Sequence, residues 1–182
     1  MSKPLMVHVI TNFAGVGSAE MMLARLIQQT EHDYQHVIIA LMKTSEVYQS
    51  TLERCQSHYA LGWNGLNTLS TVSQLRALLK KLQPATVQCW MYHANALTSL
   101  SVIGLAKKPK VVWGIHHSLA SPKDESISTK IALGISKILS QQPSAIIYCA
   151  HSSMQQNQAF GFKNRNSQVI ANSVFLDKFQ PN

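Results

Sequence analysis

Histidines stand at the ends of several apolar stretches of this sequence, at His93, His116, His117 and His151. A neutral imidazole donates one hydrogen bond and accepts another, so it suits the binding of a hydroxyl or a phosphate. At any single position, a structural histidine that caps a loop or helix is the alternative. A zinc site would require a spacing such as HxxxH or HxH with acidic support, which these four histidines lack. We therefore predict no metal site and take His116 and His117 as the candidate catalytic pair.

A glycine-bearing turn, Gly15-Val16-Gly17, follows the first apolar stretch. Glycines let the backbone come close to a ligand, and the amides of the helix that follows would point at that ligand. The turn departs from a dinucleotide fingerprint, because Glu20 stands where a third glycine belongs and Lys43 occupies the region of the expected acidic residue. We predict substrate binding by these three residues, and a turn needed only for strand-to-helix geometry stays as the alternative.

The composition excludes several classes of protein. None of the eight acidic residues directly follows a central strand, which argues against a glycosidase with paired carboxylates. Neither a GxSxG elbow nor a GxxxxGK[ST] loop is present, which disfavours serine hydrolases and phosphate-loop NTPases. The net charge of +8 favours anionic partners, but the cations are scattered along the chain. We expect no nucleic-acid partner, and an anionic membrane surface stays a candidate.

Strand-like and helix-like stretches alternate along the chain, and the strands are apolar on both faces. We expect strands at 5–10, 36–42, 57–61, 86–90, 110–115, 145–149 and 168–171. We expect helices at 19–29, 45–54, 66–83, 94–107, 127–139 and 152–160, with Ser18 as the cap of the first. This order predicts an α/β fold, a doubly wound, Rossmann-like parallel sheet with helices on both faces. Ligands bind beyond the carboxyl ends of such strands, where the candidate residues lie.

The three cysteines are dispersed and form no CxxC pair, which suits a reducing compartment. The N-terminal segment 1–6 is too short and too mixed in composition for a signal peptide. No apolar run approaches the roughly 20 residues that a membrane-spanning helix needs. We predict a cytoplasmic location, with peripheral contact to the inner face of the membrane as an extension of it.

Five segments, in order, resemble motifs of the family-4 (group 1) retaining glycosyltransferases, which have the GT-B fold. The segments are 8–20, 88–95, 111–118, 146–152 and 169–179. The first is similar to an H-V-I strand followed by a G-x-G-G-A-E turn, with Ser18 in place of the second glycine of the pair. The third looks like V-W-G-I-R-H-S, with His116 in place of the arginine, so the histidine of the family pattern is either His116 or His117.

The resemblance implies transfer of a hexose from a nucleotide-sugar to a saccharide or lipid-linked acceptor, with retention and without a metal or cofactor. Such enzymes serve polysaccharide or lipopolysaccharide biosynthesis. It places Gly15, Val16 and Gly17 near the diphosphate and one of the two adjacent histidines at the reacting sugar. It also implies that the acceptor is bound by Tyr92, His93, Asn95 and Ser118.

The resemblance further implies that residues 1–171 form the acceptor-side N-terminal domain and that 172–182 begin an interdomain linker. The C-terminal domain of the family, with an E-x7-E motif and most of the donor site, is then absent from the chain, which is expected to be inactive alone. Two alternatives stay open: a stand-alone Rossmann-like module that binds a nucleotide or a protein, and a short-chain oxidoreductase.

Overall fold

Seven parallel strands form the central sheet of the computed structural model, which describes residues 3–172. The strands are β1 (Leu5–Ile10), β2 (Gln35–Ala40), β3 (Ser57–Ala60), β4 (Thr86–Trp90), β5 (Lys110–Ile115), β6 (Ala145–Tyr148) and β7 (Ser167–Val169). Their order across the sheet is β3-β2-β1-β4-β5-β6-β7. This confirms the predicted doubly wound, Rossmann-like parallel sheet.

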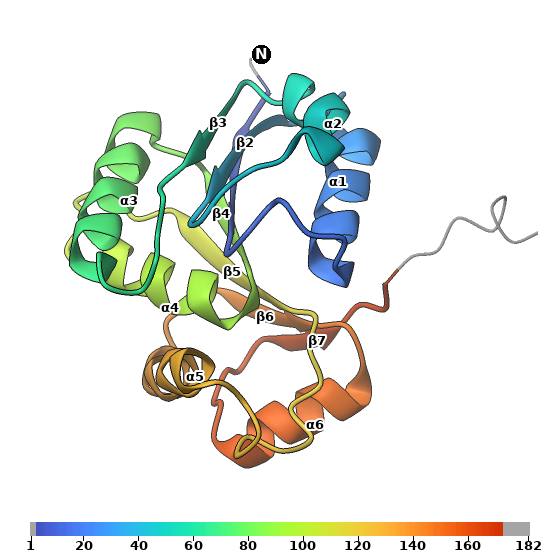
Figure 1. Ribbon diagram of the computed structural model, residues 1–182, viewed down its shortest axis with the longest axis vertical. Helices are drawn as coiled ribbons and strands as arrows, with labels where there is room; N and C mark the ends of the chain where they lie inside the picture. The colour runs from blue at the N-terminus through green and yellow to red at the C-terminus, as the bar shows by residue number, and fades with distance from the viewer. Residues whose placement is uncertain (1–2, 173–182) are drawn as a thin grey trace, which may run out of the picture.

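Helices cover both faces of the sheet (Figure 1). They are α1 (Ser18–Thr30), the 3-10 turn η1 (Glu46–Tyr48), α2 (Gln49–Glu53), α3 (Thr68–Leu82), α4 (Met91–Val102), α5 (Ile127–Leu139) and α6 (His151–Phe160). The smaller core cluster lies under α1 and α2, and the larger one lies on the other face, under α3, α4 and α5. Because side chains alternate along a strand, Val7 and Val9 of β1 enter the larger core, and Ile10 enters the smaller.

The boundary between β4 and α4 differs from the prediction. We expected a short loop after Trp90 and a helix from Ala94, but the chain turns directly into the helix at Met91. Met91 has a φ of 74°, a left-handed conformation that strains a residue with a side chain. The reversal of the chain is therefore concentrated in one residue, which neither glycine nor proline marks in the sequence.

The apolar spacing of two helices predicted their buried faces only in part. Leu69 is 88% exposed at the start of α3, although Leu75 and Leu79 of the same helix are buried. Ile127 and Ile131 of α5 are 78% and 59% exposed, whereas Ala132, Leu133 and Ser136 of that helix are buried. Among the described residues, no helix has the length and apolar character needed to cross a membrane.

The C-terminal end of the described chain also departs from expectation. The last strand was predicted at 168–171 and is observed at Ser167–Val169. Asn172, with which the predicted linker begins, is the last described residue, and the rest of the predicted linker lies outside the described part of the chain.

Candidate functional site

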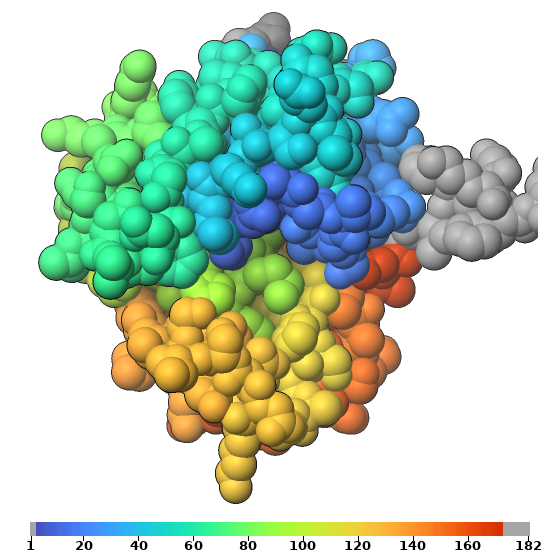
Figure 2. Space-filling model, in the orientation of Figure 1, coloured from blue at the N-terminus to red at the C-terminus, as the bar shows by residue number. Residues whose placement is uncertain are grey.

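The candidate site lies at the switch point of the sheet, between β1 and β4. The chain leaves β1 through α1 toward β2 on one side, and leaves β4 through α4 toward β5 on the other. Diverging connections of this kind open a crevice at the carboxyl ends of the two strands. Figure 2 shows a hollow on this face, bordered by the dark-blue segment after β1, the green start of α4 and the yellow segment after β5.

The glycine turn is held in place by Tyr48, a residue that the sequence analysis did not select. Its hydroxyl donates a hydrogen bond of 2.8 Å to the Gly15 carbonyl, and its ring stacks on Phe13 with centroids 4.2 Å apart. Burial raises the pKa of Tyr48, and the nearby Glu20 adds to the effect, so the phenol stays a donor at neutral pH. The turn is therefore anchored from the α2 side of the sheet.

Neither glycine of the turn is required by backbone conformation. Gly17 has a φ of −97°, and Gly15 is likewise outside the left-handed region. A Cβ on Gly15 would make an ordinary contact with the Glu20 carboxylate, and a Cβ on Gly17 would clash with that carboxylate. Because the blocking group is the end of a flexible side chain, a side chain at Gly17 could be accommodated by movement of Glu20. The remaining physical reason for glycine is close approach of the backbone to another molecule.

Ser18 does not cap α1, contrary to the prediction. Gly17 occupies the N-cap position without a side-chain cap, and Ser18 is already the first helical residue. The Ser18 hydroxyl instead contacts the His116 carbonyl, with an O–O distance of 3.5 Å. Val16, just before the helix, is 78% exposed. The helix thus begins with backbone amides that no local side chain caps, next to the segment after β5.

The His116 ring is held by two groups that are distant in sequence, and a nearby glycine leaves room for it. It stacks on Trp90, with ring centroids 5.0 Å apart and an interplanar angle of 18°. Its Nδ1 lies 2.9 Å from Oδ1 of Asn172. A Cβ on Gly114 would lie 3.4 Å from its Nε2, so the absence of a side chain there leaves room for the imidazole. Burial lowers the pKa of His116, although the Asn172 contact partly opposes this shift, and the ring is therefore neutral at pH 7.

His117 lies on the other side of the segment after β5. Its Nε2 is 2.7 Å from Oε1 of Glu125, and its ring meets the edge of Tyr92. Ser153 of α6 donates a hydrogen bond to the His117 carbonyl. The neighbouring Ser118 is exposed and donates to Gln156. The two adjacent histidines therefore have different partners, as expected for neighbouring residues that leave a strand; which of them serves catalysis stays a prediction.

The acceptor candidates on α4 are only partly accessible. Tyr92 is 2% exposed and donates a hydrogen bond to Oδ1 of Asn157, and Asn95 is fully buried. These two side chains lie in the protein interior and not on the open edge, because the helix begins at Met91 and turns them inward. His93 is half-buried and borders a surface pocket. Sequence analysis placed these residues beyond the carboxyl end of β4, where the structure also has them, without predicting which of them face outward.

An apolar pocket of about 240 Å³ lies between α4, α5 and the loop before α3. Trp63 packs near the His93 ring, with centroids 5.1 Å apart, and Ile127 and Ile131 line the opposite wall. Within the described residues, Nε2 of His93 is buried without a hydrogen-bond partner. Burial lowers the pKa of His93, and a hydrogen bond to the Ser128 backbone partly opposes this. The pocket therefore offers a mostly apolar surface, with His93 at its border.

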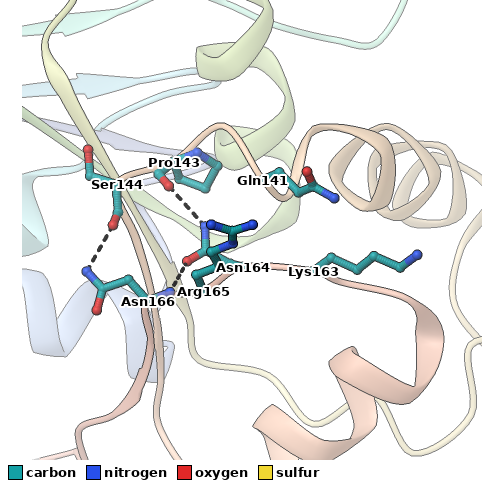
Figure 3. Close-up of a pocket in the computed structure, with 7 residues that line it drawn as sticks. All are labelled: Gln141, Pro143, Ser144, Lys163, Asn164, Arg165 and Asn166. Carbon is teal, nitrogen blue, oxygen red and sulfur yellow. Dashed lines mark hydrogen bonds between the residues drawn. The ribbon is translucent and has the colours of Figure 1, made fainter.

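A larger hollow of about 580 Å³ lies at the opposite edge of the sheet, near the amino ends of β6 and β7 (Figure 3). Its two asparagine side chains bind the backbone of the surrounding loops. Asn164 donates to the Pro143 carbonyl and Asn166 donates to the Ser144 carbonyl. The side-chain amides therefore brace the loop, and this hollow is not the candidate site.

No group of three or more histidine, cysteine or acidic side chains within residues 3–172 is arranged to hold a metal ion. His151, the remaining strand-end histidine, is exposed at the first position of α6. The prediction of a site without metal or cofactor stays a prediction.

The sheet order and the site at its switch point define a Rossmann-like domain of the GT-B type. The chain belongs to Glycosyltransferase Family 4, whose family model matches residues 15–178. A search of curated proteins finds no match to the chain.

Solved structures share this fold at low sequence identity. HepE of Anabaena, in complex with UDP, has a TM-score of 0.70 at 14% identity, over 96% of this chain and 45% of that one. The lipopolysaccharide outer core galactosyltransferase WaaB has a TM-score of 0.72 at 15% identity, over 93% of this chain and 46% of that one. The UDP-N-acetylglucosamine 2-epimerase of Rickettsia bellii has a TM-score of 0.64 at 12% identity, over 94% of this chain and 45% of that one. The chain spans about half the length of these structures.

Proposed function

We propose that this chain is the acceptor-side domain of a glycosyltransferase that moves a hexose from a nucleotide-sugar to a saccharide or lipid-linked acceptor. Family membership supports transfer chemistry, and the share of the solved structures that it spans supports cooperation with a second, donor-binding domain. HepE was solved with UDP and with UDP-glucose, so a UDP-sugar is the first donor to test. Retention of the anomeric configuration and inactivity of this chain alone are parts of the same proposal.

One observation carries the proposal: the glycine turn and His116 converge at the switch point of the sheet. The glycines permit close approach, and the uncapped amides at the start of α1 favour an anionic group beside them. A diphosphate bound there would lie near the carbonyl of His116, which Ser18 already contacts. Movement of the Glu20 side chain away from the turn would make room for this negative charge.

Positioning and charge stabilisation account for the chemistry of such a site. With Nδ1 donating to Asn172, His116 has a free lone pair on Nε2 that can accept a hydrogen bond from a sugar hydroxyl. That contact would orient the acceptor or the reacting sugar for transfer. The amides at the start of α1 would stabilise the charge that develops on the leaving diphosphate. No residue of this chain is assigned as a general base, and no metal or cofactor takes part in the proposal.

The apolar pocket supports a lipid-linked acceptor and contact with an anionic membrane. Ile127 and Ile131, which are 78% and 59% exposed, line the pocket, and the exposed Leu66 and Leu69 are next in sequence to its lining residues Gly65 and Thr68. Exposed apolar side chains grouped around a pocket are typical of an interaction surface. The exposed Lys130 on α5 adds positive charge that would attract acidic headgroups. A cytoplasmic protein with peripheral membrane contact fits this surface and the unpaired state of the three cysteines.

Transfer assays on two proteins test the proposed function. The product of the complete reading frame is expected to move labelled hexose from a UDP-sugar to a lipid-linked acceptor, and NMR of the product should show the donor's anomeric configuration. The 182-residue chain is expected to give no turnover above a buffer control. Turnover by this chain alone would overturn the requirement for a second domain. Nucleotide binding without transfer by the complete product would instead establish a binding module.

Vesicle sedimentation tests the membrane part separately. Ile131→Ser should weaken binding to vesicles that contain anionic lipid, and Val47→Ser is the matched control because Val47 is 66% exposed away from the pocket. High salt should weaken binding by the wild type. Equal binding to neutral and anionic vesicles, or equal loss in both variants, would remove the membrane from the proposal.

A further inference from the structure

A row of rings crosses the face of the sheet that α1 covers and ends at His116. In the strand registers, Met6 pairs with His36, His8 pairs with Gln88, and Trp90 pairs with Gly114. The row therefore moves one strand across and two residues toward the carboxyl end at each step, from His36 to His8, Trp90 and His116. A step of two residues keeps every member on one face. The first and last residues of the row, His36 and His116, are 80 positions apart in the sequence.

The first three rings are joined by hydrogen bonds. Trp90 Nε1 lies 3.4 Å from His8 Nδ1, and His8 Nε2 lies 3.0 Å from His36 Nδ1. His36 Nε2 lies 3.1 Å from Oγ1 of Thr30, which donates to the Leu26 carbonyl at 2.6 Å. Trp90 then stacks on His116. The row thus connects the end of α1 with the candidate catalytic histidine.

The Trp90 indole and the Thr30 hydroxyl, at the two ends of the hydrogen-bonded part of the row, determine the direction of each hydrogen bond between them. The indole nitrogen can only donate, so Nδ1 of His8 must accept, and the proton of His8 lies on Nε2. His8 then donates to His36, whose own proton lies on Nε2 and points to Thr30. The Thr30 hydroxyl uses its hydrogen for the helix carbonyl and accepts from His36. Each ring nitrogen of His36, His8 and Trp90 has one partner in the row, and His8 and His36 are both neutral.

Burial supports a structural role for the row, because it favours the neutral form of both imidazoles. His8 is fully buried, and burial followed by the nearby His36 lowers the pKa of His8 to about 3. Burial also lowers the pKa of His36, which a bond to Thr30 and the charge of Glu31 partly oppose. Tyr34 is the other titratable ring that packs near His36. A row that stays neutral at pH 7 can hold a ring in place but cannot carry charge.

We propose that His8, His36 and Trp90 are positioning residues for His116, acting through the directed hydrogen-bond row that orients the indole on which His116 stacks. Burying the polar side chains of His8 and His36 costs desolvation free energy that apolar side chains at the same two positions would not cost. A positioning role accounts for the presence of histidines there. Trp90 gains a fixed ring plane from its bond to His8, and Gly114 leaves the space in which His116 lies against it. The importance of the position of His116 rests on the proposed function, but the existence of the row does not.

Ring-nitrogen NMR of the 15N-labelled 182-residue chain tests the row without any enzymatic assay. At pH 7, His8 and His36 are both expected as single neutral tautomers with the proton on Nε2. A proton on Nδ1 of His8 would prevent acceptance from Trp90 and would overturn the proposal. This measurement uses the wild type, so it stands even where a variant fails to fold.

A pair of variants tests the action on His116. His8→Leu removes the acceptor of the Trp90 indole, whereas His8→Asn keeps an acceptor near the position of Nδ1. In His8→Leu, we expect the Trp90 indole proton to shift upfield and the proton–proton contacts between Trp90 and His116 to weaken. His8→Asn should retain both signals. Unchanged Trp90–His116 contacts in folded His8→Leu would show that the row does not position His116, whether or not the chain belongs to an active transferase.

Discussion

Acid should destabilise this protein through His8, which the fold holds in the neutral form. Burial and His36 lower the pKa of His8 to about 3 in the folded state, whereas an unfolded chain has an ordinary value of about 6.5. Between these values the unfolded chain binds a proton that the folded chain does not. The contribution of His8 is therefore fully present above about pH 6.5 and is lost progressively as the pH falls toward about 3.

The size of the effect follows from the linkage between proton binding and folding. One group contributes about 1.4 kcal/mol per pH unit in this window, so His8 alone should lower the free energy of unfolding by about 2 kcal/mol between pH 6.5 and 5. The pKa of His36 is lowered by the same cause, and its contribution has the same sign. A loss of this size is a large fraction of the total stability of a domain.

Denaturant unfolding at pH 7 and pH 5, followed by tryptophan fluorescence, measures this loss. His8→Asn removes the titrating group, so the difference in unfolding free energy between the two pH values should shrink by about 2 kcal/mol. His58→Asn is the control, because it removes an exposed imidazole from β3. An unchanged pH difference in His8→Asn, at intact cooperativity, would refute the buried neutral state of His8.

Four further outcomes are expected. In the transferase, His116→Ala should lower kcat roughly tenfold with little change in melting temperature, since it removes one substrate hydrogen bond. His117→Ala should lose about 1 kcal/mol or less of folding stability and keep most of the turnover, because its contact with Glu125 is partly exposed. Equal activity losses in His116→Ala and His117→Ala would refute this division of roles. Gly17→Val should raise the KM for the donor while circular dichroism stays native, and an unchanged KM would make the turn structural only. Gly134→Ala in α5 should raise the unfolding free energy by up to about 1 kcal/mol in denaturant titrations, because its Cβ would meet no atom within 4 Å.

The periodicity of the chain was enough to predict the fold. Alternating stretches of buried strand and amphipathic helix specify a doubly wound sheet, and each of its seven strands was placed near its observed position. Glycine, proline and capping residues mark most boundaries, as Ser45 does at the start of η1. The boundary at Met91 was missed because a single strained residue makes the turn, and the sequence carries no signal for it.

The candidate site was predicted only as a region. His116 and the glycine turn were found because ligands bind at the carboxyl ends of parallel strands. Tyr48 was missed because it lies outside every motif, although it binds the glycine turn. Trp90 lies within the segment 88–95 but was missed as a neighbour of His116, because it is the last residue of a strand and only residues after strand ends were inspected. A usable signal existed for the row: His8 and His36 each interrupt an otherwise apolar strand, and a buried polar residue needs a partner.

The sequence by itself determined the class of the fold, because apolar periodicity depends only on near neighbours along the chain. It also determined the edge of the sheet that holds the site. Tertiary structure decided which side chains face that edge, since Tyr92 and Asn95 turn inward with the first turn of α4. It decided the surroundings of His116 as well, because the ring's neighbours come from β4, β5 and the segment after β7. The order in which strands lie side by side brings those groups together, and no local pattern encodes that order.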